Sequence, residues 1–213
     1  MRRLAIAVLA APLVAAAALA LSGTAAAGAP ASVPPSDTSD TGTTTSTGTD
    51  GSLAPVDVLQ VTGLFDHVVV DAIDHAIDRA AEGGSQALIL QVNSGGAVVS
   101  NDEMRALVQR VADAPVPIGI WVGPSRSARL YGTPAQLMGV ADVTAMVSGS
   151  RIGYTGALFA LDNGRVVDFG AAADRLRAGS LSFQDARTFD ALKLDTPDVG
   201  VPTIRNMVLA MDG

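Results

Sequence analysis

The sequence contains no cysteine, and Lys193 is the only lysine among its 213 residues. The lack of cysteine excludes disulfides, a thiolate nucleophile and thiolate metal ligands, so the hydrophobic core must stabilise the fold. The single lysine limits the choice of catalytic base. Phosphate-loop, dinucleotide and paired-histidine metal signatures are also absent, and we therefore expect neither a cofactor nor a metal.

Positive charge is scarce throughout. There are 14 Lys and Arg residues against 21 Asp and Glu residues, which gives a formal net charge of -7. Binding to nucleic acid requires clustered basic side chains, and attraction to anionic lipid has the same requirement. The composition therefore argues against a nucleic-acid partner.

The first 52 residues predict two segments that precede the folded domain. Residues 1–27 combine Arg2 and Arg3, an apolar stretch and the run Ala25–Ala27, which is the plan of a cleavable secretory signal. Residues 28–52 are rich in Ser, Thr, Gly and Pro, so they predict a disordered linker. We expect an exported protein, secreted or membrane-associated, with one domain over residues 53–213.

The domain alternates between strand and helix patterns. The expected strands are residues 56–61, ending at Gly63, and then 87–92, 116–122 and 140–147. The expected amphipathic helices are residues 70–80, stopped by Gly83 and Gly84, and 101–111, with Asn101 as N-cap. This order predicts an α/β fold with a mostly parallel sheet built from right-handed βαβ units.

The remaining segments give weaker patterns. Residues 127–138 predict a helix broken by Gly132 and Pro134, and residues 148–156 a glycine-rich turn. A helix over 183–192 would be capped by Ser182, and residues 201–211 fit either a strand or a helix.

The expected turn Asn93–Gly96 follows the second strand, at the edge of the sheet where ligands bind in such folds. Paired glycines there can present backbone amides to an oxyanion. Two glycines after a strand are more often only a tight turn, so both interpretations stay open.

Three segments in this order and spacing resemble the NfeD family of membrane-associated serine proteases, which are related to ClpP and the crotonases. They are ALILQVNSGGAVVSNDEM (residues 87–104), ADAPVPIGIWVGPS (112–125) and GVADVTAMVSGSRIG (139–153). The resemblance implies a ClpP/crotonase-like fold and a protease-type site. It assigns Gly95 and Gly96 to the oxyanion hole and to peptide binding, although the proline that relatives carry before the glycine pair is absent here.

The same resemblance implies that the catalytic residues are missing. The position equivalent to the nucleophile falls on Gly132, beside Thr133, and bulky Leu130 and Tyr131 would crowd a pocket that relatives line with alanines. Ser127 lies about five residues too early, more than one helical turn away. Thr133 is the other weak candidate, but a Thr before a Pro is typically a helix cap.

A catalytic base is equally hard to find. Lys193 is a weak candidate that more often would be a surface charge, and His67 and His75 precede the second strand. We therefore expect a degenerate protease homologue that binds a peptide or a membrane-protein segment by strand addition. The alternatives are an active serine or threonine endopeptidase with a rearranged site and a structural partner of membrane proteins. Homo-oligomerisation and a membrane partner protein stay open.

Overall fold

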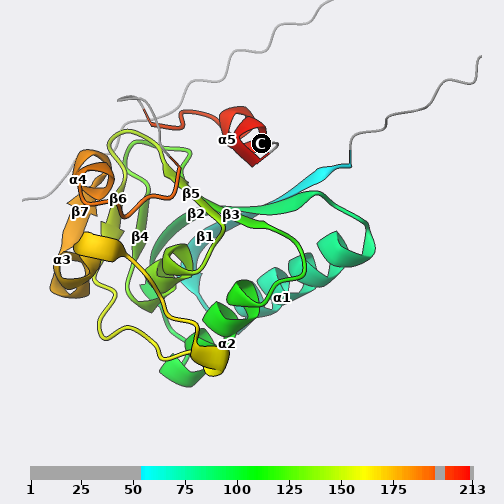
Figure 1. Ribbon diagram of the computed structural model, residues 1–213, viewed down its shortest axis with the longest axis horizontal. Coiled ribbons are helices and arrows are strands. Elements are labelled where there is room, and N and C mark those ends of the chain that lie inside the picture. Colours follow the sequence, from blue (N-terminus) through cyan, green and yellow to red (C-terminus); the bar gives the residue numbers. More distant parts are fainter. Residues whose placement is uncertain (1–53, 195–199, 212–213) are drawn as a thin grey trace, which may run out of the picture. The chain divides into compact units, whose positions relative to one another are not determined.

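The computed structural model describes residues 54–194 and 200–211. The predicted signal peptide (1–27), the predicted linker (28–52) and residue 53, where the domain was expected to start, lie outside these ranges. The described residues form an α/β fold around one seven-stranded sheet (Figure 1). The predicted fold class is confirmed, and the chain enters the sheet in the expected order of strand, helix, strand, helix, strand.

The strands are β1 (Val56–Phe65), β2 (Ala87–Ala97), β3 (Ile118–Val122), β4 (Arg129–Tyr131), β5 (Val143–Met146), β6 (Arg151–Gly153) and β7 (Ser180–Ser182). Their order in the sheet is β5-β3-β2-β4-β6-β7, and β1 pairs with the other edge of β2. Every pair of neighbours is parallel except β6 and β7.

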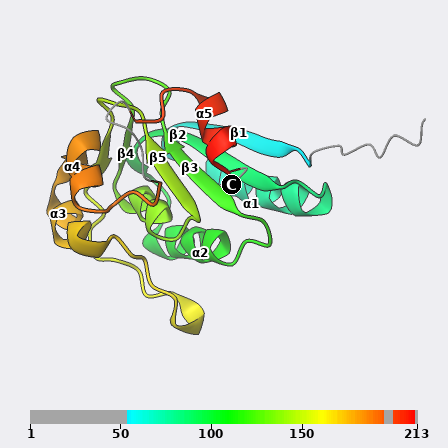
Figure 2. The same ribbon diagram turned by 45° about the horizontal axis from the view of Figure 1, so that its top comes forward.

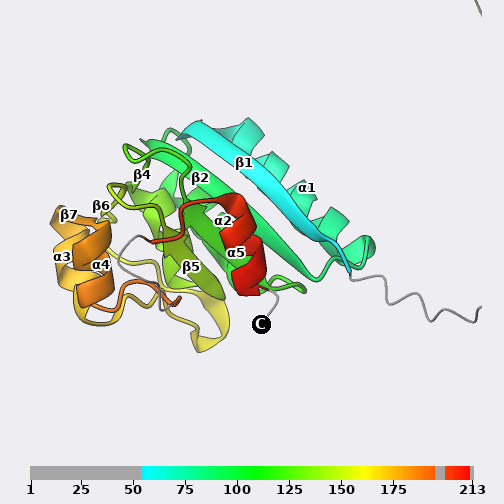
Figure 3. The same ribbon diagram turned by 90° about the horizontal axis from the view of Figure 1, so that it is seen from above.

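The helices are α1 (His67–Glu82), α2 (Asn101–Ala112), α3 (Ala173–Ala178), α4 (Phe183–Thr188) and α5 (Ile204–Met211), with short 3-10 helices η1 (Thr133–Gly139), η2 (Asp162–Gly164) and η3 (Gly170–Ala172). Figures 1 and 3 show α1 and α2 on one face of the sheet and α5 on the opposite face. Figure 2 shows α3 and α4 together at the end of the sheet that β6 and β7 form, away from α1.

Strand β2 is the central strand of the sheet, because it pairs with three other strands. Strand β1 follows one edge of β2 from the pair Val56–Ala87 to the pair Phe65–Ala97. The other edge pairs first with β3, over residues 88–92, and then with β4 through the pair Ser94–Leu130. The predicted turn at Asn93–Gly96 is therefore wrong: these residues continue β2, because β1 and β4 supply partners on both sides.

Strand β1 also runs further than its sequence pattern indicated. Gly63 was expected to end the strand, but the strand continues to Phe65. Gly63 takes a φ of +92°, and the register with β2 shifts between Gly63 and Phe65. A glycine at such a β-bulge bends a strand without ending it.

The amphipathic patterns of α1 and α2 give the main core. The buried residues of these helices pack against one face of the sheet, and they are Val70, Ile73, Ala76, Ile77 and Ala80 in α1 and Met104, Leu107, Val108, Val111 and Ala112 in α2. Helix α2 is capped by Ser100 and not by the predicted Asn101, since the Glu103 amide donates to Ser100 Oγ at 3.2 Å. The side chain of Asp66 caps α1 in the same way.

A second core lies on the other face, beneath α5. Trp121 is 1% exposed, and its indole N–H donates to the Val201 carbonyl at 2.9 Å. Met207 of α5 packs in the same cluster. Of the two structures that residues 201–211 fitted, the helix is the one observed, over Ile204–Met211.

Three other expectations need correction. Residues 127–138 form β4 and the 3-10 helix η1 in place of a broken helix, and residues 148–156 contain β6 in place of a turn only. Helix α4 is shorter than the predicted 183–192 and ends at Thr188. Its predicted cap is confirmed, because Ser182 and Asp185 form a reciprocal capping box.

Candidate functional site

The two glycines of β2 differ in their surroundings. Gly95 is exposed, whereas Gly96 is buried. The Gly96 N–H donates to Ser94 Oγ at 3.2 Å, and the same hydroxyl donates to the Gly96 carbonyl at 3.0 Å. Ser94 is 1% exposed, so no water competes for its hydroxyl. In this arrangement the Gly96 amide is satisfied within its own strand, and Gly95 is the member of the pair that meets solvent.

The position equivalent to the nucleophile lies directly against this strand. Gly132 is the N-cap of η1, and a β-carbon added to it would stand 3.4 Å from the Gly96 α-carbon. The backbone of Gly132 has φ +74° and ψ -159°, a conformation that essentially only glycine adopts. The structure thus brings Gly132 and Gly96 together, with no side chain at the start of the helix that faces the glycine pair.

Thr133 does not act as the predicted helix cap. Gly132 holds the N-cap position, Thr133 is the first residue of η1, and no side-chain hydrogen bond caps this helix. Thr133 is half-buried beside the glycine contact. Its hydroxyl is therefore the first hydroxyl along the chain after Gly132, the position equivalent to the nucleophile.

Behind Thr133, Gln136 holds η1 against the loop that follows β6. Its side chain is fully buried, and its amide nitrogen donates to the carbonyls of Thr155 and Ala157, both at 3.0 Å. Its amide oxygen accepts the Phe159 N–H at 2.8 Å. Sequence reasoning missed this contact because a lone glutamine in an irregular helix carries no motif.

The two bulky residues before Gly132 are Leu130 and Tyr131, and they point to opposite faces of the sheet. Leu130 is fully buried in the main core, because alternate residues of a strand point to opposite faces. Tyr131 lies on the other face, where its ring meets Tyr154 edge-on with centroids 5.2 Å apart. Leu130 thus belongs to the core, and the aromatic pair of Tyr131 and Tyr154 lies beside Gly132.

Ser127 is exposed in the loop between β3 and β4. Its hydroxyl lies 3.1 Å from the hydroxyl of Ser125, which cannot act as a base at neutral pH. A serine with only a second serine as its partner lacks the activation that nucleophilic attack requires.

Lys193 lies too far from Gly95 and Gly96 to act as a catalytic base beside them. It is exposed, and its ammonium group donates to the Ala141 carbonyl. The next residue along, Asp142, donates its N–H to Ile118, which pairs with Leu88. Leu88 precedes Gly96 by eight residues on β2, roughly 25 Å at the rise of an extended strand.

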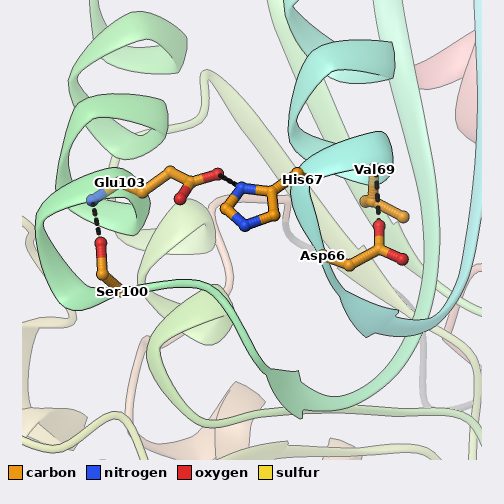
Figure 4. A network of polar contacts seen from close by, with 5 residues as sticks. All are labelled: Asp66, His67, Val69, Ser100 and Glu103. Carbon is orange, nitrogen blue, oxygen red and sulfur yellow. Dashed lines mark hydrogen bonds and ion pairs between the residues drawn. The ribbon is translucent and has the colours of Figure 1, made fainter.

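The two histidines lie on α1. Figure 4 shows His67 at the start of α1, where its Nδ1 lies 2.6 Å from the Glu103 carboxylate of α2. The His67 side chain is 79% exposed. His75 is exposed further along α1 and lines the groove between α1 and α2. Neither histidine has a described contact with a hydroxyl of Ser127 or Thr133.

That groove between α1 and α2 has a volume of about 590 Å³ and an acidic lining that includes Asp71, Asp74 and Asp78. Arg110 of α2 crosses it and binds Asp74 at 3.2 Å and Asp78 more closely. The acidic face of α1 is therefore partly neutralised by a cross-helix pair. Within residues 54–194 and 200–211, no three acidic or histidine side chains gather as metal ligands do, and none of the helices there is long and apolar enough to cross a bilayer.

Comparison with known proteins identifies the fold of the chain. No protein-family model and no curated protein matches the sequence. Solved structures do match, and they define a ClpP/crotonase-like α/β fold. One crotonase-type match is an enoyl-CoA hydratase/isomerase family protein from Silicibacter pomeroyi, with 15% identity, coverage of 73% of this chain and 78% of that one, and a TM-score of 0.51.

Closer in shape is 1510-N, a membrane protease from Pyrococcus horikoshii that is specific for a stomatin homologue. It has 20% identity, covers 74% of this chain and 78% of its own, and gives a TM-score of 0.58. A lysine-to-alanine mutant of 1510-N in complex with a substrate peptide has 18% identity, coverage of 73% and 79%, and a TM-score of 0.59. At these identities the likeness establishes the fold alone.

Proposed function

We propose that this chain is an exported, NfeD-like domain of the ClpP class that binds a peptide or a membrane-protein segment without hydrolysing it. One observation carries the proposal. Gly132 occupies the helix start that faces Gly96, and it brings no hydroxyl to that contact. Acyl transfer by a serine protease requires a nucleophile at this point.

The surroundings of Gly132 support a loss of hydrolysis. The Gly96 amide, which would stabilise an oxyanion, is bonded to the Ser94 hydroxyl. The only lysine, Lys193, donates to the Ala141 carbonyl, near the end of the sheet where β2 begins and far from Gly96. A nucleophile, a base and a free Gly96 amide are thus missing from one place, and the loss of any one such group lowers the rate of these enzymes by orders of magnitude.

Peptide binding rests on what is left at the same place. Exposed Gly95 lies next to Leu64, which is 51% exposed, and the domain has two further exposed apolar side chains in Val98 and Tyr154, which are 66% and 50% exposed. Exposed apolar side chains around accessible backbone are typical of peptide-binding surfaces. The 1510-N mutant that holds a substrate peptide has the same fold.

Hydrolysis is tested first, on the purified protein with casein and a fluorophosphonate probe. We expect neither cleavage nor labelling. Specific labelling of Ser127 or Thr133 that disappears on substitution to Ala would favour the alternative, an active serine or threonine endopeptidase.

Binding is tested by selection on the immobilised protein from two random dodecapeptide phage libraries, one displayed with free N-termini and one with free C-termini. We expect enrichment of peptides that compete with one another for one site. A selection that enriches nothing above the matrix alone overturns the peptide-binding role and favours the structural-partner alternative.

Export is proposed from residues 1–27 and tested by fusing them to alkaline phosphatase, which folds to an active enzyme only outside the cytoplasm because it needs disulfides. Phosphatase activity in whole cells is the expected outcome. An inactive fusion that is stably produced contradicts export.

A further inference from the structure

Arginines gather without acids beside the glycine pair. Arg129 opens β4 and Arg151 opens β6, and the two residues are direct neighbours across these parallel strands. Arg126 lies one loop away, where a β-carbon added to Gly149 would stand 2.9 Å from the Arg126 carbonyl oxygen. All three arginines are exposed.

Within residues 54–194 and 200–211, none of these three side chains has an acidic partner, since no ion pair joins Arg126, Arg129 or Arg151 to a carboxylate there. By contrast, Arg110 and Arg165 both have acidic partners. The chain has 21 acidic against 14 basic residues, so acids are not in short supply. Like charges on neighbouring strands destabilise a sheet, and no acidic side chain of the described part of the chain pairs with either arginine to offset this.

Neutral groups fix both positions. The Arg151 guanidinium donates to Ser180 Oγ at 2.9 and 3.1 Å and to the Ser180 carbonyl at 3.0 Å. The Arg129 backbone N–H donates to Asn93 Oδ1 at 3.2 Å. The Arg151 charge and the Arg129 backbone are thereby positioned by groups that carry no charge.

Arg129 also touches the candidate binding surface itself. A β-carbon on Gly95 would stand 3.7 Å from Arg129 Nε and 3.8 Å from Leu64 Cδ2. The exposed face of Gly95 is therefore bounded by a cation on one side and an apolar side chain on the other. A ligand that lies on Gly95 therefore contacts both the Arg129 guanidinium and the Leu64 side chain.

We propose that Arg129 and Arg151 form a carboxylate-binding site at the edge of the peptide surface, so that the bound peptide carries an acidic group beside the residue that lies on Gly95. This inference rests on the proposed peptide-binding function and names the ligand class of the same site. Guanidinium groups bind carboxylates through paired, charge-assisted hydrogen bonds. The carboxylate is either an Asp or Glu side chain or the free C-terminus of the peptide.

The test uses the peptides selected from the two random libraries by the full-length protein. We expect an Asp or Glu at a constant position, or a requirement for a free C-terminus. For one selected peptide, a fluorescein-labelled version is compared with its Glu→Gln form and its C-terminal amide by fluorescence polarisation. Whichever change lowers affinity at least tenfold identifies the source of the carboxylate.

The protein side is tested with Arg129→Gln and Arg151→Gln, each expected to weaken the acidic peptide at least tenfold and the neutral peptide less than twofold. Arg79→Gln is the matched control, because Arg79 is exposed on α1, outside the glycine surface, and its loss changes the net charge equally. Arg129→Gln should keep or raise the melting temperature, since it removes a like-charge neighbour.

Failure of this inference and failure of the proposed function give different results. Peptides selected without any preference for acid, and bound equally by Arg129→Gln, overturn the carboxylate site and leave peptide binding standing. A selection that enriches no peptide overturns both.

Discussion

Gly132 faces Gly96 so closely that a β-carbon added to Gly132 would stand 3.4 Å from the Gly96 α-carbon. Gly132 opens the 3-10 helix η1, and Gly96 lies near the end of β2. Two elements that the sequence assigns to one catalytic site therefore meet, but they meet through glycines. The contact is too close for a side chain to be added without a small shift of its neighbours.

Restoring a serine at this point should not restore hydrolysis. Gly132→Ser is expected to lower the free energy of unfolding by about 2 kcal/mol, because its backbone conformation is strained for any residue except glycine. Without a base, the new hydroxyl should stay unreactive toward a fluorophosphonate. Gly156→Ser is the control, since Gly156 also has a positive φ, of +67°, but no atom within 4 Å of its added β-carbon. Casein cleavage by Gly132→Ser contradicts the prediction.

Gly95→Ala separates binding from stability better than Gly96→Ala does. Gly96 has a φ of +142°, which strains any substitution, whereas a β-carbon on Gly95 finds ordinary contacts of 3.7 and 3.8 Å. Alanine in a strand is often more stable than glycine by about 0.5 kcal/mol. We expect Gly95→Ala to keep its melting temperature and to lose at least tenfold in peptide affinity, about 1.4 kcal/mol. Unchanged affinity would show that the peptide does not lie on Gly95.

Gln136 should be important for stability beyond its size. Gln136→Leu removes a buried amide and leaves the Phe159 N–H and the carbonyls of Thr155 and Ala157 without their partner. We expect a loss of about 3 kcal/mol, measured by urea unfolding, since each unsatisfied buried group costs about 1–3 kcal/mol. Gln136→Glu is the second variant, because it can accept from Phe159 but cannot donate to the two carbonyls. A loss below about 1 kcal/mol in both variants would mean that the loop finds other partners.

The single tryptophan reports on α5. Trp121 is 1% exposed and packs in the cluster that contains Met207, which is fully buried. Met207→Ala should cost about 3 kcal/mol and shift the tryptophan emission to longer wavelength as water reaches the indole. Leu209→Ala on the same helix is the control, because Leu209 is 60% exposed and should change stability by less than about 0.5 kcal/mol. Equal effects of the two substitutions would argue against this packing of α5.

Limited proteolysis tests the expected linker over residues 28–52. A protease of broad specificity should cleave within this Ser- and Thr-rich segment and leave a resistant core that begins near residue 53. Mass spectrometry of the resistant fragment gives its first residue. Protection of residues 28–52 at protease levels that cut a denatured control would contradict the assignment.

Local periodicity was sufficient to predict the helices that flank the sheet, because each buries one continuous stripe of its own residues. The amphipathic helices expected over residues 70–80 and 101–111 lie within α1 and α2, and each buries one stripe of residues in the core. The fold class followed from the alternation of these helices with β-branched runs.

The sequence pattern at Asn93–Gly96 predicted a turn, which is wrong, because the structure of this segment depends on residues far away in the chain. Two glycines look like a turn until β1 and β4 supply hydrogen-bonding partners on both edges. The short strands β4 and β6, of three residues each, are below the length at which alternation is recognisable.

At the site itself, the resemblance located Gly132, and the structure shows which residue it touches. The Ser94 contact to Gly96 was missed, although a local signal existed: a serine hydroxyl commonly bonds a backbone N–H two residues ahead. The arginine pair had no signal at all, since Arg129 and Arg151 are 22 positions apart and become neighbours only through the pairing of β4 with β6.

The three partners of β2 also bear on how the candidate surface would bind. Amides in residues 88–94 are enclosed by β1 on one edge and by β3 and β4 on the other, so they should exchange with deuterium only through global unfolding. Gly95 and Gly96 follow on the same strand, which makes their surface a rigid one, unlike a mobile loop. Little conformational entropy would then be lost on association, and a short peptide with few contacts can still bind measurably. Deuterium uptake should therefore change little in β2 on binding and should fall mainly outside β2, where ligand covers Arg129 at the start of β4.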